Sequence, residues 1–161
     1  METEFEGFVI TGAGIAGLAT ALALHSMVLE KAESLRATGG GIEIWTNAWK
    51  ALTVLGIADY LREQHPIPLQ SFELITLDGG GMIRNFSLQA NDRCVKRTAL
   101  LEALATLALP PVTIKFNSRV LRVRQSLSSK YSSETELEDG TVIRAKLRQN
   151  ITRSTKKQKK Y

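Results

Sequence analysis

The feature that most constrains the fold is a set of three glycines within residues 12–17, spaced as Gly-x-Gly-x-x-Gly. The apolar run that precedes them, Phe5 to Thr11, predicts a short buried strand. Residues 13–25 are mostly Ala, Leu and Ile and predict a helix. Residues 26–30 predict a second strand that ends in the acid Glu30. A strand, a glycine turn, a helix and a strand in this order form a βαβ unit.

Each glycine meets a separate physical need of a dinucleotide-binding turn. Gly12 allows the tight turn, Gly14 lets the backbone approach a pyrophosphate, and Gly17 lets the helix pack closely on the strand. Unpaired N–H groups at the helix start attract the ligand's negative charge, and Glu30 can bond ribose hydroxyls. The alternative is a glycine-rich turn without a ligand. A phosphate loop of the NTPase type is disfavoured, because no Gly-Lys-Ser/Thr follows.

The remaining pattern adds helices and antiparallel strands, so the predicted fold class is α/β, a Rossmann-like βαβ unit with added antiparallel strands and an incomplete sheet. Thr46 or Asn47 and Thr98 are the expected helix caps. Helices are expected at 46–55, 57–64 and 99–108, a hairpin at 72–77 and 82–88, and strands at 42–45, 112–116, 119–124, 131–137 and 141–146.

Charge divides the chain into two parts. The net charge of +5 is unevenly distributed. Residues 1–145 contain 14 bases and 16 acids, whereas the last 16 residues contain seven bases and no acid. We therefore expect a globular region at 1–147 and a basic, solvated tail at 148–161. Clustered lysines can attract nucleic acid or an anionic surface, but only Tyr161 interleaves them, so nucleic-acid binding has little support.

Several ordered motifs resemble FAD-dependent monooxygenases of the aromatic-hydroxylase type, and most of all the plant group related to zeaxanthin epoxidase and salicylate hydroxylase. The resemblance covers about residues 7 to 147 and rests on segments that lie far apart in the chain. These are residues 11–24, 28–36, 39–41, 45–52, 93–104 and 137–141.

The resemblance implies FAD as cofactor, NAD(P)H as reductant, and insertion of one oxygen atom from O₂ into a small organic substrate. Arg97 matches the arginine that opens the family's central helix and reaches the FAD. Lys31 and Arg36 match basic positions near the adenosine and on the loop toward the flavin. No general acid or base and no metal site is expected, and Cys94 is expected to be buried. The predicted cofactor-binding residues are Gly12, Gly14, Gly17, Glu30, Lys31, Arg36 and Arg97.

Two departures from the family pattern stand out. Only 12 residues separate Gly17 from Glu30, so we expect the helix to unwind or the second strand to shift, and a shift would move Glu30 away from the ribose. The family also continues after its final strand into an apolar segment ending in Gly-Asp-Gly. Here a basic stretch follows Leu147, which predicts a truncated FAD-binding domain.

Three functions follow as hypotheses: an FAD-dependent monooxygenase impaired by truncation, a non-catalytic binding module, and a simple NAD(P)-binding Rossmann protein. The first five residues after Met1 include three acids and no base, which argues against a signal or transit peptide and favours the cytoplasm. No apolar run approaches the roughly 18 residues of a membrane span. The substrate and the oligomeric state stay open.

Overall fold

The computed structural model describes residues 2–36, 39–65, 67–74, 84–87, 92–108, 112–125 and 133–149. They form two compact units, one from Met1–Arg36 with Leu104–Tyr161, and one from Ala37–Ala103. The division falls within α4 (Arg97–Ala108). The fold is mixed α/β, as predicted.

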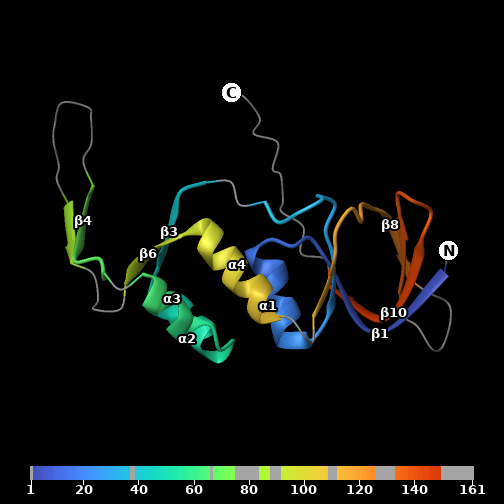
Figure 1. Cartoon of the computed structure of the whole chain (residues 1–161), viewed down its shortest axis with the longest axis horizontal. Coiled ribbons are helices and arrows are strands. Elements are labelled where there is room, and N and C mark those ends of the chain that lie inside the picture. Colours follow the sequence, from blue (N-terminus) through green and yellow to red (C-terminus); the bar gives the residue numbers. More distant parts are fainter. Residues whose placement is uncertain are drawn as a thin grey trace, which may run out of the picture. The chain divides into compact units, whose positions relative to one another are not determined.

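The first unit is built on a six-stranded sheet in the order β7-β2-β1-β10-β9-β8. The first four of these strands pair in parallel, whereas β9 pairs antiparallel with both β10 and β8. Figure 1 shows β1 and β10 side by side along this sheet. The strands are β1 (Glu2–Thr11), β2 (Met27–Leu29), β7 (Thr113–Lys115), β8 (Val120–Gln125), β9 (Ser133–Leu137) and β10 (Val142–Gln149).

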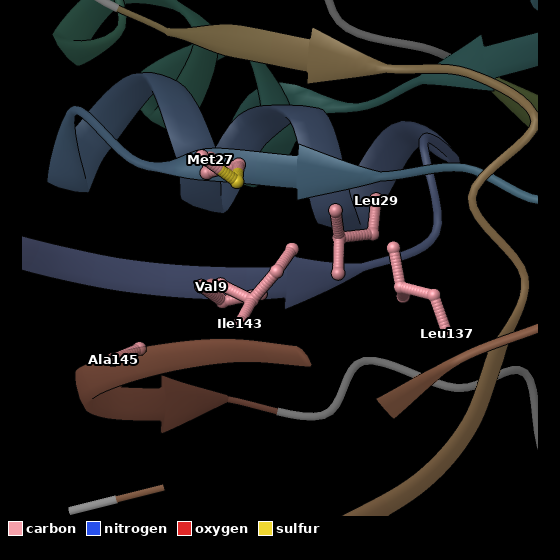
Figure 2. Packing of buried hydrophobic residues seen from close by; sticks show 6 residues of the cluster. All are labelled: Val9, Met27, Leu29, Leu137, Ile143 and Ala145. Atoms are coloured by element: carbon pink, nitrogen blue, oxygen red, sulfur yellow. The ribbon is translucent and has the colours of Figure 1, made fainter. Parts of the chain in front are cut away.

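One cluster of buried hydrophobic residues in this unit lies on a single face of the sheet. Alternate residues of a strand point to the same face, so Val9 on β1 and both Met27 and Leu29 on β2 share it. β9 and β10 complete the set with Leu137, Ile143 and Ala145 (Figure 2). On the opposite face, the Ile10 side chain lies 3.6 Å from where a Cβ on Gly17 would stand, so this face carries α1 (Ile15–Leu24).

β10 runs further than the sequence pattern predicted. The expected strand ended at Lys146, but β10 continues to Gln149, where Leu147, Arg148 and Gln149 pair with Phe8, Val9 and Ile10. The pattern ended early because the apolar alternation stops there. Backbone pairing with a neighbouring strand does not depend on that alternation.

The second unit combines short sheets with two helices. β3 (Gly41–Ile44) pairs with β6 (Arg93–Lys96), and β4 (Ser71–Leu74) pairs with β5 (Arg84–Ser87), both antiparallel. The turn predicted at 78–81 between β4 and β5 lies outside the described residues. The helices are α2 (Thr46–Val54) and α3 (Ala58–Gln64), joined by a left-handed Gly56 with φ 77°.

Trp49 makes cation–π contacts with two arginine side chains in this unit. Its side chain is buried, and the guanidinium carbons of Arg62 and Arg93 lie 4.9 and 5.9 Å from its ring centroid. Arg93 also donates from Nε to the carbonyl of His65, at 3.0 Å. Such cation–π contacts stabilise by about 0.5–1 kcal/mol or more when water is excluded.

Three local predictions were wrong. Helix α2 begins at Thr46 with Trp45 as its N-cap, and α4 begins at Arg97, so neither Thr46, Asn47 nor Thr98 is the N-cap. The strand pairing of β3 with β6 sets both starts, because each helix follows its strand almost at once. Cys94 is exposed, because the two-stranded sheet leaves one face open.

The short crossover between β1 and β2 is closed by a left-handed residue. Helix α1 ends at Leu24, and His25 adopts φ 51° and ψ 57° as its C-cap. Ser26 is buried and donates its N–H to the carbonyl of Ala21 at 3.2 Å. The chain therefore reverses within two residues, without unwinding a full turn of the helix.

Replacing His25 by glycine is expected to stabilise the protein. A non-glycine residue in the left-handed region costs about 1–2 kcal/mol, part of which is offset because glycine gains more freedom in the unfolded chain. We expect a net gain of about 0.5–1 kcal/mol, measured by urea unfolding followed by circular dichroism. The β-branched variant His25→Val should move the other way. A Gly variant less stable than the parent would contradict the strain argument.

In the part of the chain that the structure describes, no helix has the length and apolar character needed to cross a bilayer.

Candidate dinucleotide-binding site

The glycine turn lies between the end of β1 and the start of α1. Gly12 has a positive φ of 99°, which L-residues rarely adopt, and its N–H donates to the carbonyl of Leu29 at 2.8 Å. Gly14 is the N-cap of α1, with extended backbone and no side-chain cap. The first N–H groups of a helix have no partner within the helix, so this end can receive an anion.

Gly14 and Gly17 occupy contrasting surroundings. A Cβ on Gly14 would meet nothing within 4 Å. A Cβ on Gly17 would overlap the carbonyl oxygen of Gly12 and lie 3.2 Å from its carbonyl carbon. Gly17 is therefore required for packing inside the protein, whereas the space at Gly14 is open to a ligand.

Glu30 lies beside the glycine turn. Because Thr11 pairs with Leu29 in the parallel ladder, Glu30 is the first residue past the strand, level with the turn. Its Oε2 accepts the N–H of Ala13 at 2.8 Å, and its Oε1 accepts that of Ala32 at 2.9 Å. The short crossover thus brings Glu30 to the turn and does not displace it.

The predicted basic residues are more dispersed. Lys31 and Arg36 are exposed on the segment after β2. Arg97 is partly buried in the second unit, where its N–H donates to the carbonyl of Gly40 at 3.1 Å. The structure thus brings together the three glycines and Glu30, while Arg97 belongs to a different unit.

The sequence pattern did not identify the segment after β7 as one that holds the backbone of Glu30. The N–H of Glu30 donates to Lys115, and the Glu30 carbonyl accepts from Ser118, both at 2.8 Å. Asn117 is left-handed, with φ 53°, and donates to the carbonyl of Ala32 at 3.0 Å. The available signal was Asn117 itself, since Asn is enriched in this conformation after a strand.

Among the described residues, no group of three or more His, Cys, Asp or Glu side chains is arranged to hold a metal ion. The backbone N–H groups of the turn can bind an anionic ligand. The neighbouring carboxylate of Glu30 can accept hydrogen bonds from hydroxyl groups of that ligand.

The parallel strands, the glycine turn and the acid after β2 define a dinucleotide-binding unit of the Rossmann-like class. The chain is 42% identical over 148 residues to Monooxygenase 2 of Arabidopsis thaliana, an alignment that covers 86% of this chain and 35% of that protein. No family model matches the chain.

Solved structures agree with the sequence match. The structure of 2-methyl-3-hydroxypyridine-5-carboxylic acid oxygenase aligns with a TM-score of 0.69 at 26% identity, over 89% of this chain and 38% of that chain. A ternary complex of aklavinone-11 hydroxylase with FAD and aklavinone aligns with a TM-score of 0.72 at 20% identity, over 92% of this chain and 33% of that chain. At that identity, the second match concerns the fold alone.

The chain is therefore similar in sequence to plant monooxygenases and in fold to an oxygenase of known structure, as its motifs predicted. Two Arabidopsis relatives match most of this chain. The chain spans about a third of the length of each of them.

Proposed function

We propose that this chain binds FAD through the adenosine diphosphate half of the cofactor, as part of a flavin-dependent monooxygenase. The observation that carries the proposal is the open space at Gly14, at an uncapped helix start with a carboxylate nearby. A pyrophosphate needs close approach to backbone N–H groups, and a ribose needs an acceptor for its hydroxyls. The residues present fit this half of the ligand.

Each predicted residue has a distinct part in this proposal. The N–H groups at the start of α1 hold the pyrophosphate, Gly12 and Gly17 maintain the turn, and Glu30 accepts from the ribose. The basic groups Lys31 and Arg36 add positive charge for the anionic cofactor, and the part of Arg97, which belongs to the other unit, stays a prediction. We propose that residues 1–147 are the N-terminal portion of an FAD-binding domain and that these contacts lie within it.

The activity we propose is that of the monooxygenases this chain resembles. FAD, when bound and reduced by NAD(P)H, supplies the redox chemistry by which one oxygen atom of O₂ enters a small organic substrate. The contribution of this chain's own residues is to bind and orient the cofactor. No residue of the chain is assigned as a general acid or base.

The proposal is tested by titrating the purified chain with FAD and following the flavin absorption and fluorescence. Binding through the diphosphate half predicts that ADP competes with FAD, whereas FMN, which lacks the adenosine, does not. NADH serves as the comparison for the NAD(P)-binding alternative. Failure of FAD to bind, or preferential binding of NADH, would overturn the proposal.

Gly14→Ala is expected to weaken FAD binding at least tenfold, about 1.4 kcal/mol, while lowering stability by no more than about 1 kcal/mol, the usual preference for glycine over alanine at an N-cap. The backbone of Gly14, with φ −78° and ψ 174°, suits alanine, and the added Cβ meets no protein atom within 4 Å. The methyl group would instead occupy the space of the pyrophosphate. FAD titrations of the parent and the variant measure the change in affinity, and urea unfolding curves of both measure the change in stability. Undiminished affinity would mean that the ligand does not approach the turn at Gly14.

A further inference from the structure

We propose that Glu30 is a positioning residue, whose carboxylate sets the conformation of the glycine turn before any ligand arrives. This role acts through the backbone of Ala13 and differs from a hydrogen bond to a ribose. The ordering of the ligand-free turn does not depend on the proposed function, whereas its consequence for nucleotide affinity rests on it.

Both carboxylate oxygens of Glu30 are occupied by the protein's own backbone. Oε2 accepts the N–H of Ala13, 17 residues away in sequence, and Oε1 accepts the N–H of Ala32. Hydrogen bonds to an ionised acceptor are about twice as strong as those between neutral groups. The group is partly buried, so water competes less for these oxygens than at an open surface.

The backbone of Glu30 is held as firmly as its side chain. Its N–H donates to Lys115 and its carbonyl accepts from Ser118, which ties the residue to the end of β7. The carboxylate therefore projects from a fixed point in the sheet. Glu30 joins the glycine turn, the segment after β2 and the segment after β7.

These hydrogen bonds determine which N–H groups of the turn already have a partner within the protein. The N–H of Gly12 is used by the carbonyl of Leu29, and that of Ala13 by Glu30. The N–H groups that follow, at the start of α1, are the ones a helix leaves without partners. Glu30 thus holds the turn so that the unpaired donors are those at the helix start.

A ribose contact stays compatible with this role, because each carboxylate oxygen has two lone pairs. The negative charge also lies near the N-terminus of α1, where the helix dipole favours it. Removing Glu30 would therefore change the ligand-free turn as well as the contacts to a bound nucleotide.

The first test measures amide hydrogen exchange by NMR in the ligand-free chain. Glu30→Ala is expected to speed exchange at Ala13 at least tenfold, with Val28 in the parallel ladder unchanged. Glu33→Ala, which removes an exposed carboxylate three residues on, is the matched control and should leave Ala13 unchanged. Unchanged exchange at Ala13 in Glu30→Ala, with Val28 still protected, would overturn the proposal.

Glu30→Gln guards against a variant that simply unfolds. Its amide oxygen is expected to keep the Ala13 N–H, so exchange at Ala13 should lie closer to the parent than in Glu30→Ala. Equal exchange at Ala13 in the two variants, with Val28 protected in both, would contradict the role of the acceptor oxygen.

The second test separates positioning from a ribose contact by titration with 2′,3′-dideoxy-ADP, which lacks both ribose hydroxyls. Glu30→Gln and Glu30→Ala remove the same charge, but only the first retains an acceptor for Ala13. Positioning predicts at least fivefold tighter binding by Glu30→Gln, whereas a ribose contact alone predicts equal binding. If the parent chain binds no nucleotide, the proposed function fails, and the exchange measurement still decides the role of Glu30.

Discussion

Gly17→Ala is expected to destabilise the protein by about 3 kcal/mol, although alanine is the better helix former. The helix preference alone would favour alanine by roughly 0.5–1 kcal/mol. The added Cβ, however, would overlap the carbonyl oxygen of Gly12, a backbone atom that cannot rotate away. Relief requires α1 to move off the sheet or the turn to change, and overpacking of this kind typically costs 1–3 kcal/mol or more.

The measurement is urea unfolding followed by far-ultraviolet circular dichroism. Gly14→Ala is the matched control, since it adds the same methyl three residues earlier where nothing lies within 4 Å. The two variants should therefore fail in different assays, one in stability and the other in ligand binding. Equal stability of the two would show that the helix does not pack on the turn as described.

Ile143→Ala is expected to cost about 2–5 kcal/mol, the range for deleting a large aliphatic side chain from a core. Ile143 is fully buried at the centre of the sheet, in the cluster with Val9 and Leu29 (Figure 2). The cavity would open on the face of the sheet that carries this cluster, and β10 is paired on both sides, so its backbone has little scope to collapse into the cavity. The measurement is again urea unfolding.

The directly opposite residue on β9 supplies a control of opposite sign. Thr135 pairs with Ile143 and is 1% exposed, and its hydroxyl has no hydrogen-bond partner among the described residues. Thr135→Val keeps the shape and removes the buried polar atom, so it should stabilise by about 1 kcal/mol. Destabilisation by Thr135→Val would imply a partner for this hydroxyl, and loss of under 1 kcal/mol in Ile143→Ala would contradict the packing of the core.

The positions of most helices and strands could be predicted from the sequence, because their signals are local. Glycines at residues 12–17, an apolar run before them and Ala-rich residues after them predict the strand, turn and helix through backbone preferences alone. The Asp139–Gly140 turn is similar: Gly140 adopts φ 81° and donates to the carbonyl of Leu137 at 3.0 Å. The N–H of Thr141 bonds Asp139 and lowers the pKa of that carboxyl.

Strand pairings between segments that lie far apart in the chain could not be predicted from the sequence pattern. β6 was not predicted as a strand, because its four residues contain two bases and one strongly apolar residue; it becomes a strand by pairing with β3 some fifty positions earlier. Its partner also decides that Cys94 faces outward. Residues 147–149 likewise owe their strand conformation to β1.

For the candidate site, the sequence by itself determined which residues suit a dinucleotide turn, since glycine's backbone freedom and the acid after the second strand are properties of the local chain. Only the tertiary structure decided that the short crossover still delivers Glu30 to the turn. A left-handed His25 closes the crossover, the register of β2 on β1 sets the level of Glu30, and the segment after β7 holds it there. Each of these depends on contacts between segments far apart in sequence, and no local preference encodes them.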